Sequence, residues 1–164
     1  MNSANKKEEN ELKGVNQLIY PKKNIMIVDD EPDVALTLEA VLDYNGFEAY
    51  SFNDPFVALQ TFKANLYNLV VLDVMMPKMD GLKLYQEIKK IDNSVKVLFL
   101  TALNDLAIYG ENKSDMTILP NLDEICFVAK PINNSDLIQR VNAVIKLDSI
   151  GKQDNYIIKP NSRI

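Results

Sequence analysis

The 164-residue chain contains no histidine and no tryptophan, and it has a single cysteine. Without histidine it cannot build a Ser-His-Asp or Cys-His nucleophile system, offer imidazole to a metal or carry a phosphohistidine. One cysteine excludes an internal disulfide. Cys126 lies in an apolar stretch, which favours a small buried side chain over a reactive thiol.

Long hydrophobic runs and an excess of positive charge are also missing. No apolar stretch approaches the roughly 20 residues of a membrane span, and the first residues lack the apolar core of a signal peptide. The formal net charge is −5, which gives no electrostatic footprint for nucleic acid. We therefore expect a cytoplasmic protein with no membrane or direct nucleic-acid partner.

Hydrophobic residues make up 47% of the chain, which is enough for one sizeable core. We predict one folded domain over residues 23–148, between a flexible arm at residues 1–22 and a polar tail at residues 149–164, with no output domain. The arm is rich in Lys, Glu and Asn, but its apolar side chains permit a short helix over Glu11–Ile19. Those side chains are Leu12, Val15, Leu18 and Ile19.

Short apolar runs alternate with segments of helical periodicity. The runs at 24–28, 69–72, 95–100 and 125–128 predict strands buried on both faces of a sheet, and residues 47–51 predict a shorter strand. Helical spacing and capping residues predict helices at 32–44, 54–62, 82–88 and from Asn134 or Ser135 onward. This alternation predicts an α/β fold with a parallel sheet and helices on both faces.

Polar side chains stand at the ends of four predicted strands. Asp29 and Asp30 follow the first strand, Asp73 the third, Thr101 the fourth and Lys130 the fifth. Open parallel sheets bind ligands just outside the carboxyl ends of their strands. The five side chains are therefore expected at one rim, where carboxylates suit Mg²⁺ and an aspartate can attack phosphorus.

Each of these positions also has a simpler interpretation. Asp29, Asp30 and Thr101 could cap helices, Asp73 could be an exposed strand end, and Lys130 could be a surface lysine before a turn. Taken singly, the residues leave these alternatives open. Their order along the chain, with each at its own strand end, favours a common site.

With these motifs the chain resembles the receiver domains of response regulators in two-component signalling. The resemblance extends over about residues 24–147 and implies a flavodoxin-like sheet of strand order 2-1-3-4-5. It is carried by Val28-Asp29-Asp30-Glu31, by Leu72–Gly81, by Leu100-Thr101-Ala102 and by Ala129-Lys130-Pro131.

The resemblance implies that Asp73 accepts a phosphoryl group from a histidine of a partner kinase or phosphotransfer protein. Asp29, Asp30 and Asp73 would hold Mg²⁺ together with the backbone carbonyl of Met75. Beyond promoting its own phosphorylation and dephosphorylation, such a domain is not an enzyme. Its output is contact with a downstream effector protein, and a homodimer is allowed.

Further roles follow from the same resemblance. Thr101 and Lys130 would bind phosphoryl oxygens, and Phe127 matches the switch aromatic that turns inward when Thr101 moves. Gly81 is expected to supply a tight turn. Apolar Met75 and Leu103 stand where family members tune water access, which predicts a long-lived phosphoryl group.

One segment departs from the family pattern. Thr101 and Lys130 are farther apart than receivers usually place them, so we expect an unusual segment at Ala107–Glu124 that alters partner choice or dimerisation.

Three other functions compete with the phosphoacceptor. A pseudo-receiver would be an interaction module independent of phosphorylation. An aspartyl-phosphate hydrolase would use Asp73 as its nucleophile, but Met75 occupies the place of its general acid. A flavodoxin would need a loop rich in Ser, Thr and Gly where the acidic cluster lies.

Overall fold

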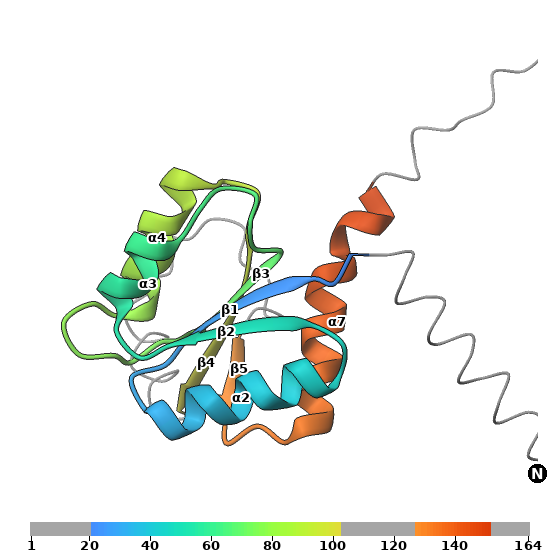
Figure 1. Cartoon of the computed structure of the whole chain (residues 1–164), viewed down its shortest axis with the longest axis horizontal. Coiled ribbons are helices and arrows are strands. Elements are labelled where there is room, and N and C mark those ends of the chain that lie inside the picture. Colours follow the sequence, from blue (N-terminus) through green and yellow to red (C-terminus); the bar gives the residue numbers. More distant parts are fainter. Residues whose placement is uncertain (1–20, 103–126, 152–164) are drawn as a thin grey trace, which may run out of the picture.

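The computed structural model describes residues 21–102 and 127–151, which form one parallel sheet flanked by helices (Figure 1). The sheet has the strand order β2-β1-β3-β4-β5, and all neighbouring strands pair in parallel. This confirms the predicted fold class and strand order. The elements are β1 (Asn24–Val28), α2 (Pro32–Tyr44), β2 (Glu48–Phe52), α3 (Pro55–Thr61), β3 (Leu69–Asp73), α4 (Gly81–Ile91), β4 (Lys96–Ala102), β5 (Phe127–Lys130) and α7 (Asn134–Gly151).

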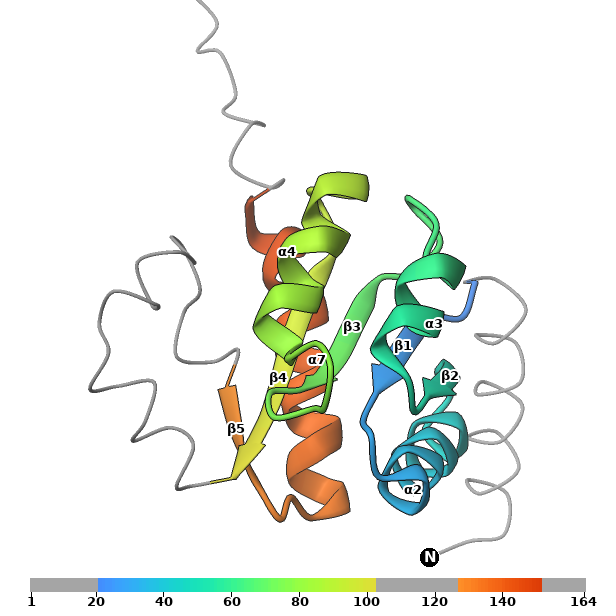
Figure 2. The same ribbon diagram turned by 90° about the vertical axis from the view of Figure 1, so that its left-hand side faces the viewer.

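Side chains of the central strands alternate between two apolar layers. Ile25 and Ile27 of β1 pack in the layer that also holds α2 and α7, whereas Met26 and Val28 pack in the layer of α3 and α4. Figure 2 shows the two pairs of helices on opposite faces of the sheet. Burial on both faces explains why the central strands are continuously apolar in the sequence.

The starts of α2 and α3 follow the sequence signals. Pro32 and Pro55 occupy the first turns of these helices, where a missing N–H group costs no hydrogen bond. The Asp54 carboxylate accepts hydrogen bonds from two backbone N–H groups of the first turn of α3, at 2.8 and 3.3 Å. The predicted cap at Asp54 is thereby confirmed.

The final helix differs from its prediction at both ends. Its capping side chain is Asn133, whose Oδ1 accepts the backbone N–H of Asp136 at 2.9 Å, and not Asn134 or Ser135. Three consecutive polar residues can each cap a helix, so the sequence alone does not choose among them. The helix also continues to Gly151, beyond residue 148, where we expected the tail to begin.

β4 and β5 end two residues later than predicted, and β2 and β3 end one residue later. β4 covers residues 96–102 and β5 covers 127–130, where we predicted 95–100 and 125–128. The ladder pairs Thr101 with Ala129 and Ala102 with Lys130. Backbone pairing continues past the last apolar residue, because hydrogen-bonding groups of the main chain need partners whatever their side chains are.

Some predictions fall outside the described residues. These are the arm at residues 1–20, the Ala107–Glu124 segment, Leu103, Cys126 and the chain after Gly151. Within the described ranges, no helix combines the length and the apolar character that a membrane crossing requires.

Asp92 joins two loops at the amino-terminal end of the sheet. Its Oδ2 accepts the backbone N–H of Asn65 at 2.8 Å, and its Oδ1 accepts both the N–H and the hydroxyl of Ser94. Asn65 has a φ of 62°, so this contact holds a residue in the left-handed region. The Ser94 hydroxyl and then the Asn65 N–H hold the pKa of Asp92 below its ordinary value.

Asp92→Ala is expected to lower the free energy of unfolding at pH 7 by about 1–3 kcal/mol, because three donors lose a buried acceptor. A lowered folded pKa means that the carboxylate contributes stability above its unfolded pKa of about 3.9, and that this contribution disappears as pH falls through the folded value. Urea unfolding of both proteins should therefore show a constant gap above about pH 5 that narrows below about pH 4. A gap independent of pH would contradict this account.

Candidate functional site

The carboxyl edge of the sheet gathers the predicted polar residues. Val28 pairs with Leu72 across β1 and β3, so Asp29 and Asp73 follow on neighbouring strands. Asp73 pairs with Leu100, and Thr101 comes directly after it. Lys130 ends β5 in register with Ala102. The parallel register alone therefore brings side chains from β1, β3, β4 and β5 to one rim.

Lys130 is the centre of this pocket. Its Nζ lies 2.7 Å from Oδ2 of Asp29 and 3.0 Å from Oδ2 of Asp73. Asp29 is 1% and Asp73 6% exposed, while the Lys130 side chain is 20% exposed. Two buried carboxylates thus share one ammonium, and their low exposure means that water replaces this ammonium poorly.

Asp30 adds a third carboxylate to the same place. Oxygen atoms of Asp29, Asp30 and Asp73 lie within 4.8 Å of one another. Three carboxylates and the ammonium of Lys130 leave a deficit of positive charge in a partly buried space. The donor set consists of hard oxygen ligands, which is the set that Mg²⁺ prefers. The residues present therefore fit a divalent cation.

The pKa shifts of Asp73 and Lys130 reflect burial and the excess of negative charge in the pocket. Burial raises the pKa of Asp73; Lys130 acts against this shift, and the charge of Asp29 acts with it. Burial works against the charge of Lys130, but hydrogen bonds to Asp29 and Asp73 outweigh it, so the pKa of Lys130 is raised. The ammonium stays charged, and it compensates the carboxylates only in part.

Backbone groups fix the orientation of both buried carboxylates. Oδ1 of Asp29 accepts the N–H of Glu31 at 3.1 Å, and Oδ1 of Asp73 accepts the N–H of Met75 at 3.3 Å. Each contact closes a short turn in which an aspartate side chain accepts a hydrogen bond from the residue two positions onward. The second oxygen of each carboxylate is thereby directed toward Lys130.

Position 81 requires glycine because there is no room for a Cβ atom, and not because the backbone adopts a conformation that favours glycine. Among the described glycines, only Gly46 has a positive φ. A Cβ at Gly81 would lie 2.1 Å from the backbone oxygen of Asp73, and the Gly81 N–H donates to Val74 O at 2.9 Å. The start of α4 therefore rests directly on the backbone of the site. The expected tight turn is replaced by this close approach.

Thr101 and Phe127 occupy the β4–β5 side of the pocket. Thr101 is fully buried, and its hydroxyl donates to the Ala102 carbonyl at 3.3 Å. The ring of Phe127 is half-buried and stacks on Phe99, with centroids 4.9 Å apart. Thr101 is thus brought to the carboxyl edge, whereas Phe127 lies two residues earlier in the register, opposite Phe99.

Sequence reasoning missed a link between the loop after β3 and the helix α3. Lys78 has a φ of 71°, and its Nζ lies 2.9 Å from Oδ2 of Asp54. The same Asp54 caps α3, so one carboxylate holds both the helix start and the loop that follows Asp73. No local pattern could have predicted this ion pair, because its partners are distant in sequence.

Fold and pocket together define a doubly wound α/β domain with an acidic, lysine-bridged pocket at the carboxyl edge of its sheet. Over residues 25–142 the chain matches the response regulator receiver domain. A probable transcriptional regulator ycf27 of Porphyridium aerugineum is 34% identical over 143 residues, which cover 87% of this chain and 55% of the relative. The chain therefore belongs to the response regulator receiver family of two-component signal transduction.

Other relatives agree with this assignment. A CpxR homolog of Haemophilus influenzae, named a transcriptional regulatory protein, is 34% identical over 122 residues, 74% of this chain and 50% of the relative. The chain spans about half the length of these curated relatives. A receiver domain from Clostridium thermocellum has the same fold, with a TM-score of 0.64 and 24% identity over 78% of this chain and 98% of that one.

Proposed function

We propose that this receiver domain is a phosphoacceptor, with Asp73 as the residue that accepts the phosphoryl group. The observation that carries the proposal is the position of Asp73, held by a backbone N–H group on one oxygen and facing Lys130 with the other. An oxygen of Asp73 forms the new bond to phosphorus. The phosphorus–nitrogen bond to a donor histidine breaks, and the imidazole leaves with the electron pair of that bond.

The donor histidine lies outside these 164 residues, because they contain no histidine. The donor is then a histidine kinase or a phosphotransfer protein, and the recipient is an effector protein. The relatives are named transcriptional regulators, which favours control of transcription as the output. Members of this family interact with kinases and effectors, and a cytoplasmic location suits such partners.

A divalent cation would be held by Asp29, Asp30 and Asp73, with the backbone carbonyl of Met75 as a further ligand. A Mg²⁺ ion held by these residues would neutralise negative charge on the transferring phosphoryl group. Lys130 remains within reach of the same group and supplies a second positive charge. The Glu31 N–H group holds Asp29 in a fixed orientation, as a ligand of such a cation would require.

We propose that Thr101 transmits the effect of phosphorylation at Asp73 to the protein surface. Among the described residues, its hydroxyl makes one long contact, to the carbonyl of Ala102 at 3.3 Å, so it can turn toward a phosphoryl oxygen at small cost. Movement of Thr101 toward Asp73 would free space beside β4 into which the half-buried Phe127 ring can turn. The stacked pair of Phe99 and Phe127 is the element that this step changes.

Intact mass measurement tests this proposal. The protein is incubated with Mg²⁺ and a small phosphodonor, beside Asp73→Ala and beside wild type with a chelator. Of these three samples, we expect a phosphoryl adduct only on the wild type that is incubated with the phosphodonor and Mg²⁺. An adduct of equal yield on Asp73→Ala would exclude Asp73 as the acceptor. No adduct together with no Mg²⁺ binding would favour the pseudo-receiver, an interaction module independent of phosphorylation.

Met75 gives a prediction for the lifetime of the phosphoryl group. Its side chain is 48% exposed beside Asp73, so an apolar group stands at the mouth of the pocket. Met75→Asn should shorten the half-life of the adduct, because a polar side chain can orient an attacking water. Mass measurements after removal of the phosphodonor give both half-lives. A wild-type half-life of seconds, or a longer one in the variant, would contradict the prediction.

A further inference from the structure

The β3–α4 loop, residues 74–80, has a strained residue at its exposed tip. The N–H group of Met79 donates to the carbonyl of Pro77 at 2.8 Å, and Lys78 between them has a φ of 71°. A hydrogen bond that spans two residues around a positive φ is the rare and strained form of the γ-turn. Strain of this kind persists only where the surrounding structure holds it, so contacts outside the turn must keep Lys78 in place.

Asp54 at the start of α3 provides such a contact. Nζ of Lys78 lies 2.9 Å from Oδ2 of Asp54, while Oδ1 of Asp54 accepts the N–H groups of Phe56 and Val57. The hydrogen bond from Lys78, and then the one from Phe56, lowers the pKa of Asp54, so this carboxylate is charged at neutral pH. Because α3 already fixes the carboxylate, mainly the lysine loses side-chain freedom when the pair forms.

The other end of the β3–α4 loop is part of the acidic pocket. The N–H group of Met75 donates to Oδ1 of Asp73 at 3.3 Å, and the carbonyl of Met75 is a proposed ligand of the cation. The side chains of Met76 and Met79 are buried in the layer of α3 and α4, whereas the side chain of Met75 is 48% exposed. The position of the Met75 backbone therefore depends on how the rest of the loop is held.

We infer that Asp54 and Lys78 are positioning residues for the cation site. Their ion pair ties the tip of the β3–α4 loop to the start of α3, and this keeps the Met75 backbone beside Asp73, where its carbonyl can serve as a ligand. Neither residue belongs to the three carboxylates whose oxygen atoms lie within 4.8 Å of one another, so both act through the loop. The inference rests on the function proposed above, since it concerns the cation that this function uses.

The charge of Lys78 separates positioning from simple electrostatics. Removal of a positive charge near an acidic pocket should by itself strengthen the binding of a divalent cation there. If Lys78 acts by holding the β3–α4 loop, its removal should weaken that binding instead. The direction in which the Mg²⁺ dissociation constant changes therefore distinguishes the two roles.

Calorimetric titration of the 164-residue protein with Mg²⁺ tests the inference without any phosphorylation. Wild type is compared with Lys78→Met, Asp54→Asn and the double variant. Asparagine keeps a side-chain oxygen that can cap α3, so Asp54→Asn removes the charge of the pair and retains the cap. Lys83→Met is the matched control, because Lys83 is an exposed lysine in the first turn of α4 and lies outside the loop.

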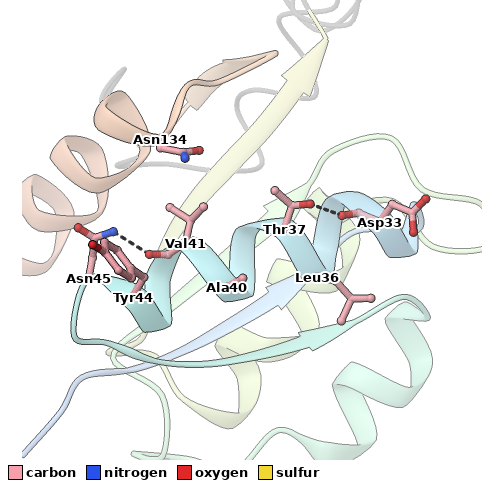
Figure 3. A pocket seen from close by; sticks show the side chains of 8 residues that line it. All are labelled: Asp33, Leu36, Thr37, Ala40, Val41, Tyr44, Asn45 and Asn134. Atoms are coloured by element: carbon pink, nitrogen blue, oxygen red, sulfur yellow. Dashed lines mark hydrogen bonds between the residues drawn. The ribbon is translucent and has the colours of Figure 1, made fainter.

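Amide exchange measured by NMR on the same proteins reports the β3–α4 loop directly. The amide of Met79, which closes the γ-turn, is the probe. The last turn of α2 is the internal reference, because α2 packs in the layer on the opposite face of the sheet. Figure 3 shows Val41 and Tyr44 of this turn beside the groove on the outer side of α2. Unchanged exchange there verifies that the fold is retained.

We expect Mg²⁺ to bind about three- to fivefold more weakly to Lys78→Met and to Asp54→Asn, the range that an exposed ion pair permits. The amide of Met79 should exchange faster in both variants. The double variant should bind Mg²⁺ no more weakly than the weaker single variant, because either substitution already breaks the pair. Lys83→Met should bind Mg²⁺ at least as tightly as wild type.

Tighter Mg²⁺ binding by Lys78→Met would overturn the inference, and so would an unchanged affinity in either single variant, even where Met79 exchanges faster. Losses that add in the double variant, or a wild type that binds no Mg²⁺, would also overturn it. An adduct on Asp73 together with unchanged Mg²⁺ affinities would retain the phosphoacceptor and reject the positioning role. No adduct together with the expected loss of Mg²⁺ affinity would do the reverse.

Discussion

Lys130→Met is expected to lower the free energy of unfolding by about 3 kcal/mol when no divalent cation is present. The substitution removes the ammonium that lies 2.7 Å from Asp29 and 3.0 Å from Asp73. It leaves two buried carboxylates side by side with no positive charge between them. Methionine preserves the apolar stem of the side chain, so the loss reports the charge and not a cavity.

Mg²⁺ should recover most of this loss. A cation bound by Asp29, Asp30 and Asp73 takes over the role of the ammonium, and a ligand that binds only the folded state stabilises it by mass action. Thermal unfolding of both proteins with Mg²⁺ and with a chelator measures the effect. The difference between the two conditions should be larger for the variant than for the wild type.

Lys90→Met is the matched control for this experiment. Lys90 pairs with Glu87 at 2.7 Å, but its side chain is 68% exposed, and exposed ion pairs contribute less than about 1 kcal/mol. The control should be nearly as stable as the wild type and should respond to Mg²⁺ in the same way. A Lys130 variant whose loss of stability is the same with and without Mg²⁺ would contradict the cation site.

Gly81→Ala is the second substitution with a large expected effect. The new Cβ would lie 2.1 Å from the Asp73 backbone oxygen and 3.2 Å from the Val74 Cα. Backbone atoms cannot rotate away as a side chain can, so β3 and α4 have to separate. We expect a loss of about 3 kcal/mol, at the upper end of overpacking costs, together with a lower yield of the phosphoryl adduct.

Gly46→Ala is the control for this substitution, because it introduces backbone strain without a steric clash. Gly46 has a φ of 89°, and nothing lies within 4 Å of an added Cβ. Its substitution should cost about 1–2 kcal/mol of backbone strain and leave the adduct yield unchanged. Urea unfolding and intact mass give both quantities. If Gly81→Ala were as mild as Gly46→Ala, the close approach of α4 to Asp73 would be wrong.

The sequence predicted the fold because its signals are local. Apolar runs such as Ile25–Val28 are bounded by polar residues and turns, and the predicted α2 has the observed ends at Pro32 and Tyr44. The site positions of Asp29 and Asp73 follow from the same signal, since a polar residue directly after a buried run must lie at the edge of the sheet. Local patterns therefore determine both which strands form and where they end.

Nonlocal contacts account for what the sequence could not predict. The extension of β5 through Lys130 depends on pairing with β4, and the need for a glycine at position 81 depends on the backbone of Asp73. The ion pair of Lys78 with Asp54 joins two loops whose proximity only the fold establishes. Each of these features requires the coordinates of a second element, which no window of sequence contains.

The central claim is that Asp73 itself carries the phosphoryl group. Reduction of an acyl phosphate with borohydride converts an aspartate into homoserine, and peptide mass spectrometry then locates the converted residue. After incubation with Mg²⁺ and a small phosphodonor, we expect homoserine at position 73 and at no other carboxylate. Conversion of Asp29 or Asp30 in place of Asp73 would contradict the proposed division between the acceptor and the residues that hold the cation.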